Sequence, residues 1–428
     1  MRFTSTLAGL LIFTGTFTGP GVAQAATETA TETATETVTE TTGCAAVLPR
    51  PDGHGITCVE VRRRPQSDGS ELRDVTMTST AIFQASGGTP VIDPLSRPIT
   101  VRVYLPKDYD PSRATPYHAL YLLNGGGDNY DAWTTKAGLV SLVHDAGSFD
   151  GIVVMPTGGM TGWYADWAGR TDGYFAPKWE TYHIEQLIPW IDSNFNTVAD
   201  RSGRGLAGLS MGGYGTLRYA AAHPGVFSVI GAFSPGIDLR ARPAQRTISD
   251  SMWQSGAAIE LTDLGEFRVN KYDNGSPLPV LDQEVQRRYR LDTLFGPHTT
   301  TVFHGRTVDD WPAANPADLV TQGRYAPYDG RLALYAGGCA SLPSAPDGTE
   351  PAPAACGYDT RASDDAPGVS EPILGAYASE FDATLTGLGV GHRYCYSRGG
   401  HDWNAWSAYL VDFLRYAYGT APAHCPAP

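Results

Sequence analysis

Short apolar runs separated by longer amphipathic stretches follow one another along the chain from Cys44 onward. Runs of this length predict strands, and the stretches with apolar residues on one face predict helices. The predicted strands are Arg73–Thr80, Ile99–Leu105, His118–Leu123, Gly151–Met155, Arg204–Leu209, Val229–Phe233, Arg331–Tyr335 and Arg393–Tyr396. Alternating strands and helices are typical of a mostly parallel sheet with helices on both faces. The pattern therefore predicts an α/β fold with an eight-stranded sheet.

A long segment rich in aromatic and arginine residues interrupts this alternation between Asp238 and Gly330. We interpret it as an insertion over about residues 239–330 that forms a partly helical cap over the site. Its role is either substrate selection or packing. With 428 residues, 42% hydrophobic and 18% charged, the composition is that of a globular protein, and one large domain over residues 44–428 accounts for it.

The first residues have a different character. Met1-Arg2, the apolar stretch Leu7–Phe17 and Ala23-Gln24-Ala25 form the three parts of a secretory signal peptide, predicted over residues 1–25. Residues 26–43 repeat threonine and glutamate without aromatic residues, which predicts a disordered linker. This linker is either a spacer through a cell envelope, open to O-glycosylation, or a tolerated low-complexity leader.

No later segment reaches the roughly 18 apolar residues that a membrane helix needs. We therefore expect a secreted or cell-envelope protein without an integral membrane segment. The formal net charge of −14 disfavours nucleic acid and anionic membrane surfaces as partners, because phosphate binding needs clustered lysine and arginine. The basic run Arg62-Arg63-Arg64 is interpreted as a solvated strand end.

The chain has six cysteines, an even number that favours disulfides in an exported protein. Six cysteines allow 15 connectivities, and the sequence does not choose among them. Proximity along the chain suggests three pairs, namely Cys44 with Cys58, Cys339 with Cys356, and Cys395 with Cys425. The spacing is not that of zinc ligands, so no metal is predicted.

The pentapeptide Gly208-Leu209-Ser210-Met211-Gly212 has the Gly-x-Ser-x-Gly pattern of a nucleophile elbow. It lies between a predicted strand and the helical pattern Gly215–Ala222, and its glycines remove Cβ atoms that would clash in a sharp turn. The alternative is a serine in an ordinary turn. Strand, elbow and helix in this order favour Ser210 as an acyl-enzyme nucleophile. A serine after the fifth of eight strands is the α/β-hydrolase order, which becomes the predicted fold class.

A serine nucleophile needs a base, an acid that orients the base, and donors for the oxyanion. His401 is the best-placed base, because Gly399-Gly400-His401 follows the last predicted strand and precedes a terminal helix. Spacing alone leaves the acid open among Asp347, Glu350, Asp359, Asp364, Asp365 and Glu371.

The oxyanion donors are expected in two places. One is the backbone N–H of Met211, the residue after the nucleophile. The other is expected in the loop Leu122–Asp128 after the third strand, where three glycines let the backbone approach a substrate closely. Asp128 and Asp131 of this region lack the register of a calcium loop, and neither a metal nor another cofactor is predicted.

Several separated blocks resemble the secreted antigen-85-type mycolyltransferases, a branch of the esterase D-like α/β hydrolases. The resemblance covers roughly Ile99 to Tyr416, without the insertion and the termini. The blocks are Tyr121–Gly125, Asn129–Trp133, Val154–Gly159, Trp163–Trp167, Lys178–Thr181, Gly208–Gly212 and His401–Trp406. The combination of Lys-Trp-Glu-Thr with Gly-Leu-Ser-Met is more specific than an elbow alone.

The resemblance implies roles for further residues. It favours Glu371 as the acid, because that glutamate lies eighteen residues before Gly389 and thirty before His401, close to the family spacing. It implies that Gly126 and Met211 supply the oxyanion N–H groups and that Trp403 lines the acyl or acceptor site. Asn124 stands where the mycobacterial enzymes have an acid tied to trehalose binding, so it is the substrate-binding candidate and trehalose is in doubt as acceptor.

The resulting hypothesis is a monomeric serine acyltransferase or esterase. Its expected partners are an acyl ester or glycolipid donor, such as a mycolyl or other long-chain ester, and a sugar or cell-envelope hydroxyl as acceptor. Two alternatives remain. One is a secreted carboxylesterase that hydrolyses acyl esters, and the other is a non-catalytic envelope or adhesion protein on a hydrolase scaffold.

Overall fold

The computed structural model describes residues 40–82, 99–159, 161–168, 176–260, 283–338, 369–420 and 425–426. The predicted signal peptide and most of the predicted linker lie outside these residues. So do Cys339 and Cys356, and with them the pairing predicted between them.

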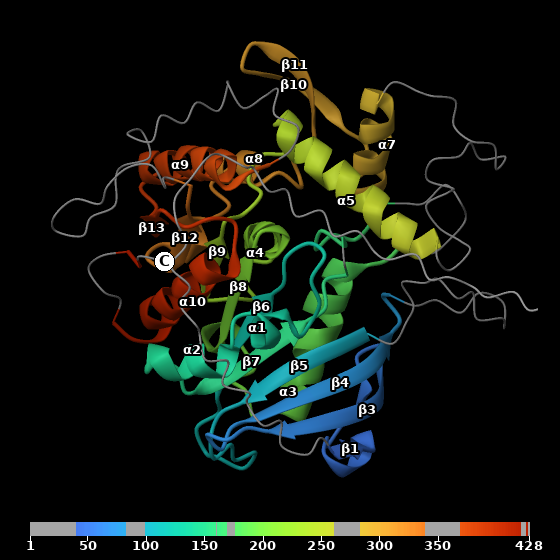
Figure 1. The fold of residues 1–428 in the computed structure, drawn as a ribbon, viewed down its shortest axis with the longest axis vertical. Helices are drawn as coiled ribbons and strands as arrows, with labels where there is room; N and C mark the ends of the chain where they lie inside the picture. Colours follow the sequence, from blue (N-terminus) through green and yellow to red (C-terminus); the bar gives the residue numbers. More distant parts are fainter. Residues whose placement is uncertain are drawn as a thin grey trace, which may run out of the picture. The chain divides into compact units, whose positions relative to one another are not determined.

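One mixed sheet of eleven strands forms the core (Figure 1). Its strands are β1 (Glu40–Thr42), β2 (Asp52–Gly53), β3 (Ile56–Pro65), β4 (Glu71–Ser79), β5 (Ile99–Leu105), β6 (His118–Leu123), β7 (Gly151–Pro156), β8 (Arg204–Leu209), β9 (Val229–Phe233), β12 (Leu332–Ala336) and β13 (Arg393–Tyr396). The order is β1-β3-β4-β5-β7-β6-β8-β9-β12-β13, with β2 paired to β3. The strands from β7 to β13 pair in parallel, and those from β1 to β7 pair antiparallel.

All eight predicted strands are present, within a few residues of their predicted bounds. The predicted sheet was nevertheless too small and too parallel, because β1, β2 and β3 extend it on the antiparallel side. The run Arg62-Arg63-Arg64 lies at the carboxyl end of β3, just before its last residue Pro65, as predicted, and the three arginines are partly exposed. Arg63 pairs with Glu71 of β4, and Arg64 pairs with Asp74. These cross-strand ion pairs explain how so polar a segment forms a strand.

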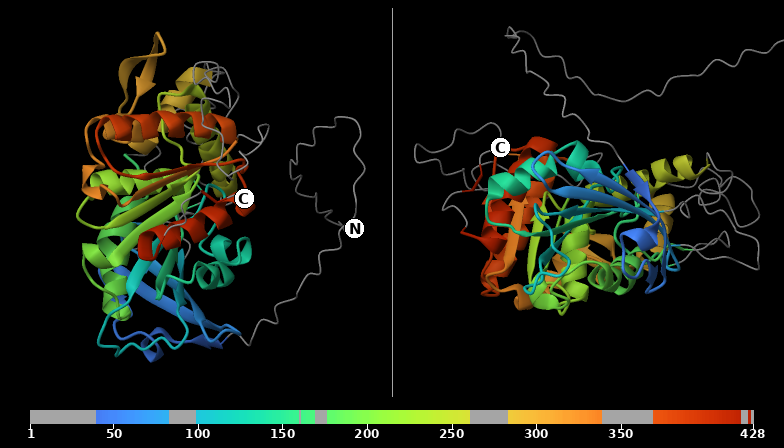
Figure 2. Two further views of the ribbon diagram at one scale, coloured as in Figure 1. Left: turned by 90° about the vertical axis from the view of Figure 1, so that its left-hand side faces the viewer. Right: turned by 90° about the horizontal axis from the view of Figure 1, so that it is seen from below.

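Helices cover both faces of the sheet (Figure 2). The helical elements in chain order are η1 (Cys44–Ala46), α1 (Ala132–Thr135), α2 (Leu139–Ala146), the π-helical η3 (Thr181–Leu187), α3 (Ile188–Asn194), η4 (Arg201–Gly203), α4 (Met211–Ala222), α5 (Arg242–Glu260), α7 (Gln283–Phe295), α8 (Pro316–Thr321), η5 (Ala326–Tyr328), α9 (Glu371–Gly387) and α10 (Trp403–Tyr418). Helices α2 and α10 pack with one face of the sheet, whereas α3, α4 and α9 pack with the other.

Successive residues of β9 show how the sheet separates these two layers. Val229 and Phe233 belong to the apolar cluster that includes α2 and α10, while Ile230 and Ala232 belong to the cluster on the opposite face. Strands buried on both faces carry continuous apolar sequence. This explains why the central strands could be recognised as apolar runs.

The described part of the insertion contains α5, α7, α8 and a hairpin of β10 (Thr299–Phe303) and β11 (Arg306–Asp310). Helices α5 and α7 pack against each other at the upper right of Figure 1. The hairpin projects beyond them, and Val302 on it is 73% exposed.

The end of the predicted linker is ordered, which corrects the expectation of disorder there. Glu40–Thr42 forms β1 and pairs antiparallel with Val61–Arg63 of β3. Threonine favours strands, and the edge of β3 offers free backbone groups for pairing. Low apolar content was therefore a poor guide for these three residues.

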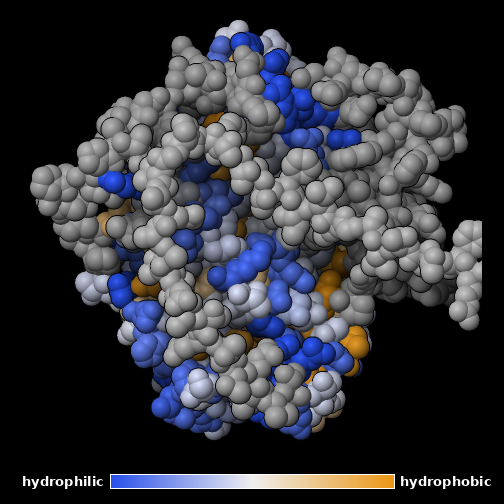
Figure 3. Space-filling model, in the orientation of Figure 1, coloured by the Kyte–Doolittle hydropathy of each residue, from blue (hydrophilic) through white to orange (hydrophobic). Residues whose placement is uncertain are grey.

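Two of the predicted disulfides are present. Cys44 is bonded to Cys58, joining η1 to β3, and Cys395 is bonded to Cys425, joining β13 to the C-terminal residues. In the described ranges, no helix combines the length and apolar character that crossing a membrane requires. Figure 3 shows that the described surface on this face is mainly hydrophilic, with hydrophobic residues in small scattered groups.

Candidate active site

Ser210 occupies a sharp turn between β8 and α4. Its φ of +53° lies in the left-handed region, which is uncommon for a residue with a side chain and concentrates at functional sites. A backbone hydrogen bond of 2.8 Å from Ser210 N to Phe233 O fixes the turn against β9. A Cβ atom at Gly208 would lie 2.5 Å from the carbonyl oxygen of Gly212. The Gly-x-Ser-x-Gly pattern therefore has the steric function expected of an elbow.

The side chains of Ser210, His401 and Glu371 form a continuous hydrogen-bonded series. His401 Nε2 lies 2.9 Å from Ser210 Oγ, and His401 Nδ1 lies 2.8 Å from Glu371 Oε2. The carboxylate accepts from Nδ1–H, so Nε2 is left to accept from the serine hydroxyl. Residues separated by up to 191 positions along the chain thus meet at the carboxyl edge of the sheet.

Glu371 begins α9 and is only 5% exposed. Its second oxygen, Oε1, accepts hydrogen bonds from Ser234 Oγ at 2.8 Å and from the backbone N–H of Gly337 at 2.7 Å. A buried carboxylate needs such partners to remain charged. The other acids considered from the sequence, Asp347, Glu350, Asp359, Asp364 and Asp365, lie outside the described residues.

Ser234 and Trp406 are functional candidates that the sequence did not single out. Ser234 follows β9 directly, and Trp406 donates from Nε1 to Ser234 Oγ at 3.1 Å. The ring of Trp406 also stands edge-on to His401, with 4.8 Å between the ring centroids. A polar residue directly after a buried parallel strand was the signal available, because such strand ends meet at one edge of the sheet.

Residues 124–128, here called the glycine loop, run beside the elbow. Asn124 is 1% exposed, and its side-chain amide donates to the backbone oxygens of Gly125 and Asp128 at 2.8 and 3.1 Å. Its side-chain oxygen accepts from the backbone N–H of Gly158 at 3.2 Å. The structure thus places Asn124 beneath the loop, where it holds the loop's backbone. Substrate binding by Asn124 stays a prediction.

Gly126 and Met211 come from the two segments that run side by side here, the glycine loop and the elbow. Gly126 is exposed in the glycine loop, and Met211 is the first residue of α4. The first backbone N–H groups of a helix have no partner within the helix and carry partial positive charge. A Cβ atom at Gly125 would lie 2.6 Å from Leu209 and 3.6 Å from Ser210 Cβ. The loop therefore passes close to the serine, as an oxyanion role for Gly126 requires.

Tyr164 ties the glycine loop to the core. Its hydroxyl donates to the backbone oxygen of Asn124 at 2.8 Å. Burial raises the pKa of Tyr164 well above its usual value, which keeps the hydroxyl protonated as a donor. Both Trp163 and Tyr164 have positive φ, of 49° and 48°. Two adjacent side-chain-bearing residues in this region indicate a conformation imposed by the surrounding contacts.

Trp403, the predicted acyl or acceptor contact, begins α10 two residues after His401. Its ring meets the rings of Trp133 and Trp406 edge to face, at centroid distances of 5.2 and 5.3 Å. The ammonium group of Lys136 lies 5.7 Å from its centroid and also pairs with Asp128. Trp403 is partly exposed, and Trp406 lies between its ring and that of His401. An acyl or acceptor contact by Trp403 stays a prediction.

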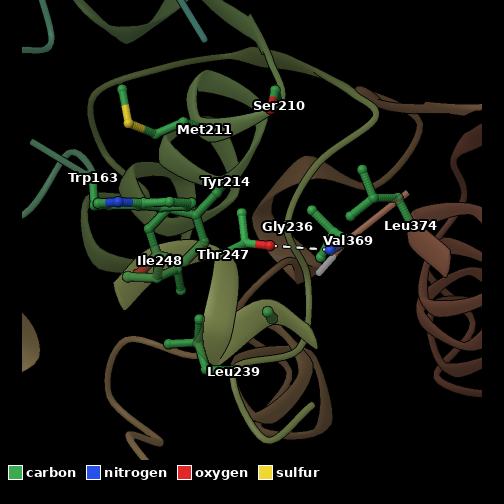
Figure 4. Close-up of a pocket in the computed structure, with 11 residues that line it drawn as sticks. Trp163, Ser210, Met211, Tyr214, Gly236, Leu239, Thr247, Ile248, Val369 and Leu374 are labelled. Atoms are coloured by element: carbon green, nitrogen blue, oxygen red, sulfur yellow. Dashed lines mark hydrogen bonds between the residues drawn. The ribbon is translucent and has the colours of Figure 1, made fainter. Parts of the chain in front are cut away.

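An apolar pocket opens beside Ser210 (Figure 4). Its lining residues come from the segment after β7, the elbow and α4, the segment after β9, α5 of the insertion and the start of α9. They include Trp163, Met211, Tyr214, Leu239, Ile248 and Leu374. Among the described residues, no group of three histidine, cysteine, aspartate or glutamate side chains is arranged to hold a metal ion. The site therefore joins a serine, a histidine and a glutamate in one hydrogen-bonded series beside an apolar space, an arrangement that is chemically suited to acyl transfer.

Comparison with known proteins gives relatives of two kinds. Residues 93–283 match a family described as "Putative esterase". An esterase of Mycobacterium tuberculosis is 44% identical over 142 residues, covering 33% of this chain and 30% of that protein. The diacylglycerol acyltransferase/mycolyltransferase Ag85B of Mycolicibacterium smegmatis is 31% identical over 158 residues, covering 36% of this chain and 44% of Ag85B.

A solved ferulic acid esterase has a TM-score of 0.48 and 18% identity, covering 82% of this chain and 98% of its own. The mixed sheet, the helices on both faces and the sharp turn at Ser210 are features of the α/β-hydrolase fold. Residues 93–283 are similar to the esterase family, and the predicted resemblance to esterases and antigen-85-type mycolyltransferases is confirmed. The matches span less than half the length of these curated relatives.

Proposed function

We propose that this chain is a serine-dependent esterase or acyltransferase that works through an acyl-enzyme. The observation that carries the proposal is the hydrogen-bonded series from Ser210 through His401 to Glu371, which begins at an elbow and borders an apolar pocket. Relatedness to esterases and to mycolyltransferases supports the same class of reaction.

In the proposed reaction, Ser210 Oγ attacks the carbonyl carbon of an ester while His401 Nε2 takes the hydroxyl proton. Glu371 stabilises the resulting imidazolium through Nδ1–H. The backbone N–H groups of Gly126 and Met211 hold the oxyanion of the tetrahedral intermediate. The intermediate then collapses, and the alcohol leaves with the proton from His401, so that the acyl group remains on Ser210.

A second hydroxyl compound resolves the acyl-enzyme by the reverse sequence, with His401 as base. Water gives a free acid, and a sugar or cell-envelope hydroxyl gives a new ester. Transfer is favoured by the partly exposed Trp403, which follows His401 by two residues and packs on Trp406 beside it, since aromatic rings pack well on the apolar faces of sugar rings. The relationship to Ag85B supports transfer of an acyl group to a hydroxyl acceptor and does not decide the length of that acyl group. An oxidising location, either secreted or in the cell envelope, fits the disulfides.

The test uses the purified protein, a soluble ester donor and mass spectrometry, with and without a free sugar. We expect acid or acylated sugar from the wild type and a loss of at least about 10³-fold in Ser210→Ala. Ser202→Ala is the matched control, because Ser202 is an exposed serine bonded to Asp200. New acylated sugar would identify a transferase, and free acid alone would identify a carboxylesterase.

A serine-reactive fluorophosphonate separates these outcomes from a binding role. Covalent labelling of the wild type, absent in Ser210→Ala, is expected from an activated nucleophile. A folded wild-type protein that is neither labelled nor active on any ester would instead support a non-catalytic envelope or adhesion protein.

A further inference from the structure

The apolar pocket beside Ser210 ends blindly. Figure 4 shows Ser210 and Leu239 at opposite ends of the residues that line it. Leu239 is 1% exposed and Ile248 is 2% exposed, so buried side chains close the end away from the serine. The pocket has a volume of about 40 Å³. An apolar cavity that holds benzene has roughly 150 Å³, so this pocket accepts a smaller group.

The interior of the pocket is apolar because its few polar atoms already have partners. Tyr214 donates its hydroxyl to Ala314 O at 2.9 Å. Thr247 Oγ1 accepts from the backbone N–H of Val369 at 3.0 Å, as drawn in Figure 4. A charged or hydroxylated acyl group would lose its bonds to water here without replacement.

The walls are held in place from both sides of the pocket. Trp163 Nε1 donates to Ser251 Oγ of α5 at 3.1 Å, and the Trp163 ring stands edge-on to Tyr214 with 5.7 Å between centroids. The hydrogen bond from Val369 to Thr247 joins α5 to the segment before Glu371. Helix α5 of the insertion is therefore fastened to the core at two points, which keeps the pocket narrow.

We propose that this pocket binds the acyl group and that it selects esters of short, apolar acids of about two to four carbons over long-chain esters. The inference rests on the proposed role of Ser210, because an acyl group enters the pocket only if it is attached to that serine. Each methylene that fits contributes roughly 0.8 kcal/mol, or about fourfold in binding, whereas a chain longer than the pocket meets the closed end.

Gly236 is a position at which the usable depth of the pocket can be tested. It lines the pocket, and a Cβ atom there would meet only Tyr214 Cβ, at 3.9 Å. This is an ordinary van der Waals distance, so Gly236→Ala adds a methyl group to the pocket without displacing its wall. Gly225→Ala is a matched control, since a Cβ atom at Gly225 meets nothing within 4 Å and Gly225 is exposed outside the pocket.

The first experiment measures kcat/KM of the full chain on p-nitrophenyl acetate, butyrate, octanoate and palmitate. We expect butyrate to exceed octanoate by at least about tenfold, the smallest effect typical of one misfitting methylene. If palmitate or octanoate equals or exceeds butyrate, the pocket does not limit the acyl chain and the inference is wrong, while the proposed function stands. No cleavage of any ester and no fluorophosphonate labelling would instead remove the proposed function.

The second experiment moves the limit by substitution. Gly236→Ala should lower kcat/KM on butyrate at least about tenfold while changing acetate less than about twofold, and Gly225→Ala should match the wild type on both. Ile248→Ala should raise octanoate cleavage relative to butyrate by removing part of the closed end. Equal effects of Gly236→Ala on acetate and butyrate, or an unchanged ratio in Ile248→Ala, would place the acyl group elsewhere.

Discussion

Ser234 holds the carboxylate of Glu371 through the oxygen that does not face His401. Ser234→Ala removes this bond and leaves Trp406 Nε1 without its acceptor. A hydrogen bond to a charged group contributes roughly 1.5–3 kcal/mol, so we expect kcat to fall about tenfold to a hundredfold. KM should stay nearly constant, because Ser234 lies behind the acid.

Steady-state kinetics on a soluble ester checks this split between kcat and KM. Ser202→Ala, a substitution on the surface, provides the control. An unchanged kcat in Ser234→Ala would mean that Gly337 N alone keeps Glu371 in place.

Individual site residues differed in how well the sequence identified them. Ser210 and His401 stand in glycine-flanked motifs, where the local pattern itself reflects the turn they occupy. Glu371 was favoured only through family resemblance, because six acids shared one region and spacing did not separate them. Ser234 acts on a residue 137 positions away, and no local pattern encodes such a contact. Asn124 was predicted to bind substrate from its position in a motif, but only the structure shows that its side chain is buried.

At the scale of elements, Gly212 allows α4 to pack against the end of β6. A Cβ atom there would lie 2.6 Å from Asn124 O and 2.8 Å from Leu123 O. These neighbours are backbone atoms, so Gly212→Ala must displace the glycine loop from the elbow. We expect at least about a tenfold loss of kcat, since misplacement of an oxyanion donor costs up to roughly 10²–10³.

Gly387→Ala is the control for this substitution, because a Cβ atom at the end of α9 meets nothing within 4 Å. Kinetics at a temperature where circular dichroism shows both variants folded would separate activity from stability. Retention of wild-type kcat by Gly212→Ala would show that the loop and the elbow can move apart without consequence.

His183 of η3 joins α4 to the end of β7 through two hydrogen bonds. Its Nδ1 lies 2.9 Å from Tyr219 Oη, and its Nε2 lies 2.9 Å from Thr157 O. The carbonyl requires Nε2–H, so the ring is neutral and accepts from Tyr219. Burial lowers the pKa of His183 to about 4 from 6.5. Because the pKa is lower in the folded protein, neutral His183 contributes to the free energy of unfolding. This contribution is fully present above pH 6.5 and is lost as the pH falls through about 4.

The expected size of this effect is up to about 3 kcal/mol of unfolding free energy. Urea denaturation of wild type and His183→Gln at pH 7, 5 and 4 measures it. The wild type should lose more stability than the variant between pH 6.5 and 4, although the variant is less stable at pH 7. Parallel losses in both proteins would show that other groups control unfolding in acid.

At the scale of the whole molecule, the central parallel strands were predictable because burial on both faces makes their sequence continuously apolar. The strands on the antiparallel side of the sheet were not all predictable in this way. Strand β3 carries three consecutive arginines, of which Arg63 and Arg64 pair with acids of β4, and β1 takes its structure from the edge of β3. Pairing partners distant in sequence decide these strands, whereas local apolar pattern decides the central ones.

The Cys395–Cys425 disulfide tests how far the C-terminal residues support the site. It joins β13, the strand before the His401 loop, to a residue thirty positions later, across α10. Cys395 is fully buried, so both cysteines are best changed together in Cys395→Ala/Cys425→Ala. Closing a loop of this length typically contributes roughly 2–4 kcal/mol, and the double variant should lose that much stability.

At low temperature the kcat of the double variant should remain near wild type, because Glu371 and Trp406 still hold His401. Thermal inactivation and unfolding measured side by side should then shift together to lower temperature, and wild type treated with a reductant should behave like the variant. An early loss of kcat before unfolding would instead mean that this disulfide positions His401 directly.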